Sequence, residues 1–410
     1  MKGIGKEDES MQAGQKPLSD ITVLDLSRVL AGPYATMVLG DLGADVIKIE
    51  RPVVGDDTRH WGPPEAGGEA AYYLCVNRNK RSVTVNLKDA EGQRIIRELA
   101  RTSDIVIENY MAGTLDRLGL GYKDLKQVNP GLIYCSITGF GQDGPYRDKP
   151  GYDFMIQGMG GIMSFTGPVE GPPMKVGVAI VDITTGLFAV NAILAALRHR
   201  EKTGQGQYID MALLDSTLAW LANVGSNYLV SGVNPTRWGN AHPNIVPYEP
   251  FLTADGTYIA LAVGNDLQWK KFCELAGLND LADDPRYATN PARVENRKEL
   301  IPLVAEAMLK RPGDEWLAEL DRLRIPCGPI NTLDKVFADP QVHHRKMVAE
   351  VPHPTAGTVK MVASPMKMSR TPCEIRRYPP LLSEHTEEVL KERLKFDEDR
   401  IRRLREAGVI

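Results

Sequence analysis

The feature that most constrains the fold of this chain is the alternation of strand-like and helix-like segments over residues 21–141. Apolar runs at 21–26, 44–50, 81–87, 104–110 and 131–141 predict buried strands, and helical patterns separate them at 31–44, 89–103 and 122–129. This alternation predicts an α/β fold with a largely parallel sheet that helices cover on both faces. The first strand, helix and strand form the opening of a Rossmann-like large domain.

Sheets of this kind bind ligands beyond the carboxyl ends of their strands. The first turn reads SRVLAGPYAT and lacks the GxGxxG fingerprint of NAD-binding proteins. Arg51 directly follows Glu50, and a cation there suits an extra phosphate better than a bare ribose. The residues that fall at the strand ends are mostly polar, aromatic or cationic: Arg28, Val29, Arg51, Asn109, Tyr110 and 138–142. Arg117 follows in TLDRLGLGY and either reaches the same rim or is an exposed helix charge.

The stretch 175–200 begins as an apolar run, passes through Asp182 and becomes a helix with leucine, valine and isoleucine at helical spacing. Asp182 stands where an N-cap residue would stand, and aspartate is among the commonest caps. The alternative is that this carboxylate is a nucleophile, held ionised by the helix dipole at the mouth of a cleft. The local sequence leaves both interpretations open.

Composition excludes several classes of protein. The chain has 410 residues, 43% of them hydrophobic and 25% charged, as in ordinary globular proteins, and its length allows two domains. A formal net charge of −4 argues against nucleic-acid binding. No run of eighteen consecutive apolar residues is present, which predicts no membrane-spanning segment. The five scattered cysteines, none in a CxxC pair, favour a reducing compartment, so a cytoplasmic location is expected.

The chain is expected to divide into four parts. Residues 1–17 are polar, lack the apolar stretch of a signal peptide, and are interpreted as a disordered lead-in. The large domain is expected over 18–230, and a linker with a smaller α+β domain over 231–335, including a hairpin that turns at Asp255 and Gly256. Residues 336–410 are expected to return to the large domain.

No P-loop, HExxH, GxSxG or histidine cluster with metal spacing occurs, so no metal site is predicted. His242 lies in a Gly/Pro/Asn-rich stretch, where a structural loop histidine is the alternative to a functional one. Asp153 lies in another stretch rich in glycine and proline, at 144–177. Two carboxylates, Asp153 and Asp182, beside a phosphate-friendly rim point to acyl or carboxyl chemistry on a phosphate-bearing carrier.

Nine motifs in order along the chain carry a resemblance to a known family. They are VLDLSRVLAGPYATMVLGDLGADVIKIERP, NRNKRSVTVNLK, DIVIENYMAGTLDRLGLGY, SITGFGQDGPY, PGYD, GVAIVDITTG, TGQGQYIDMALLDS, IPCGPINT and PPLLSEHTEEVLKE. With these motifs the chain resembles the family III CoA-transferases, the formyl-CoA transferase and CaiB/BaiF group, and is most similar to the succinyl-CoA:glutarate or dicarboxylate branch.

The resemblance assigns roles position by position. It implies Asp182 as the catalytic residue. It implies CoA contacts at Val29, Arg51, the strand Val85–Lys88, Asn109, Tyr110 and Arg117, and an acyl-side pocket from Leu30, Trp61, Tyr72, Tyr152, Asp153 and His242. It also implies an interlocked homodimer, an acyl-CoA thioester and a carboxylic acid as substrates, and no permanently bound cofactor.

Two departures from the family pattern bear on the substrate. Formyl-CoA transferases have a glutamine where this chain has Leu30 and a tetraglycine loop that this chain lacks, which argues against oxalate and formate. A dicarboxylate such as succinate, glutarate, malate or mesaconate is the expected acceptor, and succinyl-CoA the expected donor. The sister racemases use a histidine where this chain has Tyr152, and racemisation needs a base on each face of the α-carbon.

The resemblance therefore favours CoA transfer through an anhydride and a thioester on Asp182. Two alternatives stay open: a racemase like those that act on α-methylacyl-CoA, and a non-catalytic CoA-binding subunit. Exchange of the α-proton with deuterated water would identify the racemase. An Asp182→Ala variant that keeps the activity of a complex would identify the subunit.

Overall fold

The structure is a computed structural model that describes residues 16–410, so the predicted lead-in at 1–17 lies almost wholly outside the described residues. Contacts between residues divide the chain into two compact units. Unit 1 holds the residues up to Gly160, Gly177–Ser226 and Gln341–Ile410, and unit 2 holds Gly161–Val176 and Asn227–Pro340. The stretch Gly161–Val176, which the sequence assigned to the large domain, thus groups with unit 2.

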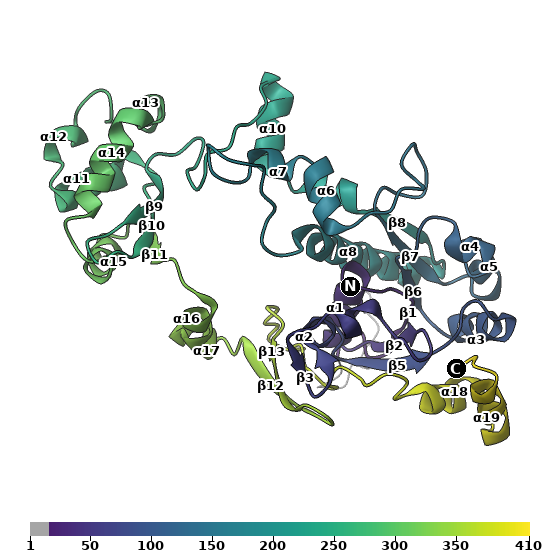
Figure 1. Cartoon of the computed structure of the whole chain (residues 1–410). Helices are drawn as coiled ribbons and strands as arrows, with labels where there is room; N and C mark the ends of the chain where they lie inside the picture. Colours follow the sequence, from purple (N-terminus) through teal and green to yellow (C-terminus); the bar gives the residue numbers. More distant parts are fainter. Residues whose placement is uncertain (1–15) are drawn as a thin grey trace, which may run out of the picture. The chain divides into compact units, whose positions relative to one another are not determined.

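Unit 1 is built on a six-stranded sheet in which every neighbouring pair of strands is parallel (Figure 1). The predicted α/β class with a parallel sheet is therefore confirmed. The strand order is β5 (Lys80–Thr84), β2 (Asp45–Glu50), β1 (Thr22–Asp25), β6 (Ile105–Glu108), β7 (Ile133–Thr138) and β8 (Tyr208–Ala212). The register aligns Val23 of β1 with Val46 on one side and with Ile105 on the other.

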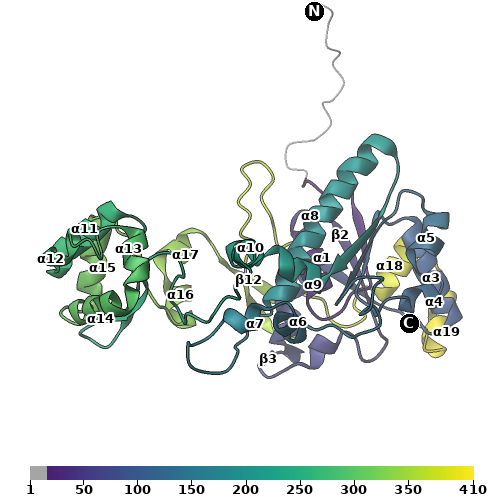
Figure 2. The same cartoon turned by 90° about the horizontal axis from the view of Figure 1, so that it is seen from above.

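Helices cover both faces of this sheet, as Figures 1 and 2 show. One face carries α1 (Ala31–Asp41) and α8 (Ile180–Thr203), and the other carries α3 (Ala90–Arg101), α18 (Thr386–Leu394) and α19 (Glu398–Glu406). Burial on both sides explains why the central strands are continuous apolar runs. The C-terminal helices return to the sheet because Val389, Leu390 and Leu404 join its core.

Helix α8 is the one helix of the described residues that is long and apolar enough to cross a membrane by length and composition, although its apolar residues do not form one unbroken run. Its buried side packs on α1 and the sheet, and a side chain at Gly186 would come within 2.7 Å of the carbonyl oxygen of Ala31. An apolar composition of this kind is typical of a core helix in close contact with its neighbour.

Shorter elements of unit 1 surround the carboxyl edge of the sheet or extend from it. They are the 3-10 helix η1 (Asp57–His60), β3 (Glu65–Ala66), β4 (Glu69–Ala70), α2 (Ala71–Val76), α4 (Thr114–Arg117), α5 (Tyr122–Val128), α6 (Asp153–Met159), α9 (Leu213–Ala219), and the hairpin of β12 (Val348–His353) and β13 (Gly357–Val362). Helices α10 (Ala222–Ser231) and α17 (Pro340–His344) cross the boundaries between the units.

Unit 2 has its own core around Trp269, Phe272 and Trp316. The predicted hairpin is confirmed, because β9 and β10 pair antiparallel on either side of Asp255 and Gly256, and Gly256 has φ +77°. The elements of this unit are α7 (Ile162–Phe165), β9 (Tyr248–Leu252), β10 (Tyr258–Ala262), α11 (Asp266–Ala276), α12 (Asn279–Ala282), α13 (Asn290–Glu295), α14 (Arg297–Met308), α15 (Gly313–Arg322), β11 (Cys327–Pro329) and α16 (Leu333–Ala338).

Candidate active site

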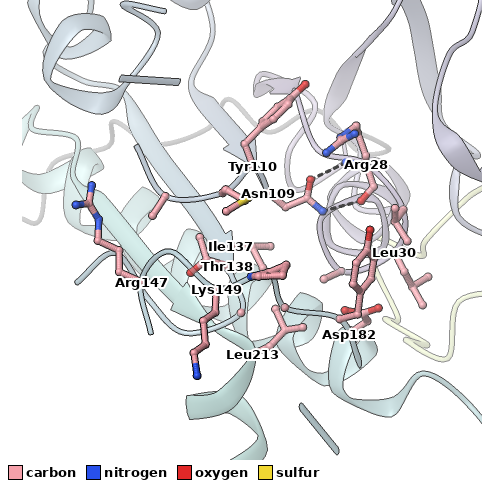
Figure 3. Close-up of a pocket in the computed structure, with 18 residues that line it drawn as sticks. Arg28, Leu30, Asn109, Tyr110, Ile137, Thr138, Arg147, Lys149, Asp182 and Leu213 are labelled. Carbon is pink, nitrogen blue, oxygen red and sulfur yellow. Dashed lines mark hydrogen bonds between the residues drawn. The ribbon is translucent and has the colours of Figure 1, made fainter. Parts of the chain in front are cut away.

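A cavity of about 240 Å³ lies in unit 1 at the carboxyl ends of β1, β6 and β7 (Figure 3). This is the edge of the sheet at which the sequence predicts a ligand. Six of the predicted site residues line the cavity together: Val29, Leu30, Asn109, Tyr110, Tyr152 and Asp182. Arg28, Arg147 and Lys149 add positive charge to the lining. In Figure 3 Asp182 and these last two basic side chains lie on different sides of the cavity.

Asp182 lies in the first turn of α8, but it is not the cap of that helix. The N-cap residue is Ala179, which has no side chain able to cap, and Asp182 is the third residue of the helix. The carboxylate that accepts from the helix start is that of Asp153, which receives hydrogen bonds from the backbone N–H of Val181 (2.8 Å) and of Asp182 (3.4 Å). The cap interpretation of Asp182 is therefore wrong, and its carboxyl is left to line the cavity.

The electrostatic setting of Asp182 also differs from the prediction. Burial, and then the nearby charge of Asp153, together raise the pKa of Asp182 to about 7. The helix dipole was expected to hold the carboxylate ionised, but loss of hydration and a like charge outweigh it. With its pKa raised this far, Asp182 is partly protonated at neutral pH, and only its ionised form can act as a nucleophile.

Apolar and aromatic side chains gather next to the start of α8. Leu30 is buried against Met37 and Val76, and Tyr72 packs against this group. Trp61 meets Tyr72 edge to face, with ring centroids 5.2 Å apart. Burial, and then the charge of Asp182, raise the pKa of Tyr72 to about 12, so its phenol stays neutral beside the carboxyl. Three predicted acyl-pocket residues thus lie together near Asp182.

Asn109 holds the turn between β1 and α1 through two hydrogen bonds. The backbone N–H of Arg28 donates to Asn109 Oδ1 (2.8 Å), and Asn109 Nδ2 donates to the Arg28 carbonyl (2.6 Å), as drawn in Figure 3. The Arg28 guanidinium lies over the ring of Tyr110, 4.9 Å from its centre. The side-chain amide of Asn109 is therefore used to shape the cavity wall.

Val29 has a backbone conformation that β-branched residues rarely adopt, with φ +68°. Its N–H donates to the carboxylate of Asp56 at 3.3 Å. Asp56 in turn forms a fully buried ion pair with Lys48, with 2.8 Å between Nζ and Oδ2. A strained residue at a cavity wall persists only where the surroundings fix it, and this buried pair does so.

A second, smaller hollow adjoins the first and is lined by Arg51, Val85 and Tyr110 together with Arg28. Arg51 and Arg28 both form ion pairs with Asp57. Glu50 is unavailable to a ribose, because Arg59 and Ser82 bind its buried carboxylate. The predicted preference for a phosphate-bearing ligand over NAD is consistent with this arrangement of charges.

Comparison with known sequences decides the family. The pattern of CoA-transferase family III matches residues 18–386. The chain belongs to CoA-transferase family III. It is 48% identical to a human (Homo sapiens) succinyl-CoA:glutarate CoA-transferase over 96% of this chain and 90% of that protein. It is 50% identical to a succinate–glutarate CoA-transferase of Agrobacterium fabrum over 92% of this chain and 95% of that protein.

A solved structure agrees with the sequence comparison. The crystal structure of a CaiB/BaiF family protein from Brucella suis superposes with a TM-score of 0.83 at 48% identity and covers 92% of this chain and all of that one. The predicted resemblance and the predicted enzyme class are confirmed: the protein is a CoA-transferase, and CoA thioesters are its substrates. In the part of the family III enzyme that the structure describes, no group of three or more histidine, cysteine, aspartate or glutamate side chains could hold a metal ion.

Eight predicted site residues of the transferase do not line the main cavity. Arg51 and Val85 line the smaller hollow, Tyr72 packs against the group of Leu30 with Trp61 on its ring, and the other four lie elsewhere. The carboxylate of Asp153 accepts a hydrogen bond from the backbone at the start of α8. Lys88 is exposed after β5, and Arg117 ends α4 with its guanidinium on Thr114 Oγ1. His242 belongs to unit 2, where its ring contacts Tyr248, with centroids 5.2 Å apart, and its Nδ1 accepts from a backbone N–H.

Two basic residues at the cavity of the transferase were not singled out from the sequence. Arg147 and Lys149 lie on the loop between β7 and α6, and Lys149 Nζ lies 3.8 Å from the centre of the Tyr146 ring. Arg147 and Arg117 both approach Gly113, so they belong to one basic area. The signal available in the sequence is RDK within a glycine- and proline-rich stretch that directly follows a buried strand.

Proposed function

We propose that this family III CoA-transferase moves CoA from succinyl-CoA to a dicarboxylic acid, with glutarate as the first acceptor to test. The position of Asp182 carries the proposal. Its carboxyl lines the cavity at the first turn of α8, and burial and Asp153, rather than a cation, set its pKa. Relatives named as succinyl-CoA:glutarate CoA-transferases support the choice of substrates.

Ionised Asp182 would begin the reaction by attacking the carbonyl carbon of the donor thioester. The C–S bond breaks, CoA leaves as a thiolate, and a mixed anhydride between Asp182 and the donor acid remains. The thiolate then attacks the Asp182 carbonyl carbon of the anhydride and releases the donor acid, which leaves an aspartyl-CoA thioester. The acceptor carboxylate attacks this thioester, and the released thiolate attacks the acceptor carbonyl of the second anhydride. These steps regenerate the Asp182 carboxylate.

The surroundings of Asp182 suit these intermediates. An anhydride is readily hydrolysed, and the apolar group of Leu30, Tyr72 and their neighbours limits the access of water. No side chain caps the first turn of α1, and Leu30 and Ala31 line the cavity at that turn. The backbone N–H groups there are suited to stabilise the oxyanion formed at each attack.

The basic residues suit the anionic parts of both substrates. We infer that Arg51, Lys88 and Arg117 contact the phosphates of CoA, with Val29, Val85, Asn109 and Tyr110 beside the nucleotide. The cavity itself contains Arg147 and Lys149, which could hold the second carboxylate of a dicarboxylic acid. His242 and Trp61 remain proposed acyl-side residues.

An acceptor screen tests the proposed function. Purified protein is supplied with succinyl-CoA and, separately, with glutarate, malate, mesaconate, oxalate and formate. We expect CoA transfer to the dicarboxylates with carbon chains like that of succinate, and the slowest transfer to oxalate and formate. If CoA is transferred to none of these acids, the proposal is overturned.

The racemase alternative is tested in the same preparation. Tyr152 lines the cavity where the racemase reaction would need a histidine base. We therefore expect no exchange of the α-proton of a 2-methylacyl-CoA with deuterated water. Exchange without a free carboxylate would favour the racemase.

We infer that the enzyme is a homodimer, interlocked as its resemblance to the family implies, and that it is cytoplasmic. Large apolar side chains support an interface, because Leu187 and Phe188 of α8 are exposed and Leu229 and Val230 of α10 are 83% and 90% exposed. Light scattering at micromolar concentration is expected to give twice the mass of the chain. A monomer at that concentration would contradict this assignment.

A further inference from the structure

Asp153 joins two helices at the position where the proposed nucleophile lies. It is the first residue of α6, and its Oδ1 accepts a hydrogen bond from Gln157 Nε2 at 2.6 Å. Its Oδ2 accepts from the N–H groups of Val181 and Asp182 in the first turn of α8. One carboxylate thereby satisfies the unpaired donors at the start of α8 and fixes the backbone that carries the Asp182 side chain.

Asp153 is also the charged group that acts on Asp182. The elements packed around the start of α8 carry the titratable or charged groups Tyr72 and Cys75 (α2), Tyr34 (α1), Arg28 (the turn before α1), and Lys149 and Tyr152 (the loop before α6), while Asp215 is exposed on α9. Burial raises the pKa of Tyr34, Tyr72 and Cys75, so these side chains stay neutral at pH 7, and Asp215 acts on Asp210. Asp153 is the group whose charge raises the pKa of Asp182, after burial itself.

We propose that Asp153 is a positioning residue whose negative charge destabilises ionised Asp182, so that each acylation of Asp182 relieves a repulsion. This inference rests on the proposed function, because it assumes that Asp182 becomes acylated. The carboxylate of Asp182 carries a full charge, whereas its anhydride and its CoA thioester are neutral. Repulsion from Asp153 therefore raises the energy of the free enzyme but not that of the covalent intermediates.

We expect the free enzyme and its acylated forms to be closer in energy than they would be without Asp153. A carboxylate that is well solvated or paired with a cation is a poor nucleophile, and its acylated form would be sparsely populated. The like charge of Asp153 brings the free and acylated forms closer in energy, while its hydrogen bonds keep the first turn of α8 in place. Charge and geometry can be separated, because a neutral side chain can keep the hydrogen bonds.

The test compares two neutral variants that can still cap α8, Asp153→Asn and Asp153→Ser, with Asp153→Ala, which cannot. Activity requires ionised Asp182, so kcat rises with pH through the pKa of Asp182. In Asn and Ser variants we expect this acid limb to move to lower pH by about one unit. We also expect the fraction of enzyme held as a covalent adduct with succinyl-CoA to fall several-fold, with the KM for succinyl-CoA unchanged. Asp153→Ala should lose kcat further.

A matched control removes a carboxylate elsewhere. Asp215→Asn, at an exposed position of α9, should leave both the acid limb and the adduct fraction as in the wild type. If the wild type forms the adduct at Asp182 but the Asn and Ser variants show its pH profile and adduct fraction unchanged, the inference about Asp153 is overturned and the proposed function stands. If the wild type turns over without an adduct at Asp182, the proposed reaction through Asp182 is overturned, and with it the role of Asp153.

Discussion

Two sets of carboxylates at the same edge of the sheet have opposite surroundings: Asp25 and Asp56 are buried, and Asp153 and Asp182 are partly buried. Asp25 and Asp56 form buried ion pairs with Lys80 and Lys48. Burial alone would raise the pKa of Asp56, but the charge and hydrogen bond of Lys48 leave it below its ordinary value. Asp182 has Asp153 as its neighbour instead, and its pKa is raised.

This difference in surroundings indicates that the carboxylates paired with lysine and the carboxylates of Asp153 and Asp182 have separate roles. The paired carboxylates are permanently charged and hold the wall of the cavity, including the strained backbone of Val29. No ion pair of the described residues includes Asp153 or Asp182, so the two carboxylates interact unfavourably unless one of them becomes neutral. Carboxylates of the first kind stabilise a fold, whereas the second kind are available for chemistry.

The largest effect is expected when the proposed nucleophile is removed. We predict that Asp182→Asn lowers kcat by about 10⁴-fold or more, because the amide cannot form the anhydride. The folded structure should persist, since Asn is close in size and removes a buried charge. Steady-state CoA transfer measures the loss, circular dichroism checks the fold, and retention of a tenth of the activity would contradict the assignment.

The next largest effect is expected when the buried ion pair of Lys48 and Asp56 is broken. Lys48→Met leaves the buried Asp56 carboxylate without its partner, and we predict a loss of about 3–5 kcal/mol in the free energy of unfolding. Urea denaturation measures this difference. The control Lys391→Met removes a partly exposed ion pair with Glu387 and should leave the unfolding midpoint unchanged. Equal effects of the two substitutions would show that the buried pair contributes no more than a surface pair.

The two kinds of carboxylate should affect stability with opposite dependence on pH. The pKa of Asp182 is about 7 in the folded enzyme against an ordinary value of 3.8, so between these pH values the unfolded chain releases the proton and the folded chain keeps it. Stability contributed by Asp182 therefore falls as pH rises. Asp182→Asn should stabilise the protein by about 3 kcal/mol at pH 8 and by much less at pH 4.5.

Asp56 should act in the other direction. Its lowered pKa means that its contribution is complete at neutral pH and is lost as the pH falls below 3.8, the ordinary value. Unfolding curves of the wild type and of Asp182→Asn at several pH values measure the first effect. A stability gain that is the same at pH 4.5 and pH 8 would contradict the raised pKa of Asp182.

The smallest expected effect is at the rim. Arg117→Ala should raise the KM for succinyl-CoA by about three- to ten-fold with little change in kcat, because one exposed cation contributes modestly to phosphate binding. Arg198→Ala, which removes an exposed arginine paired with Glu201 on α8, is the control and should leave KM unchanged. A loss confined to kcat would place Arg117 outside the CoA contacts.

The sequence predicted the sheet because its strands are apolar runs buried on both faces, and local periodicity records that burial. It also predicted six of the residues that line the cavity, since the carboxyl ends of neighbouring strands share one edge. It failed at the start of α8, where the cap comes from Asp153, far earlier in the chain. No local pattern encodes such a long-range hydrogen bond, or the fold of the loop that brings Arg147 and Lys149 to the cavity.

The most direct test of the account is the covalent state of Asp182 during turnover. The enzyme is incubated with succinyl-CoA without an acceptor, quenched in acid, digested, and the peptide that contains Asp182 is analysed by mass spectrometry, with Asp182→Asn as the blank. We predict an increase that corresponds to a CoA thioester on Asp182, which disappears when hydroxylamine or glutarate is added. An unmodified Asp182 peptide in enzyme that turns over at its full rate would contradict the account.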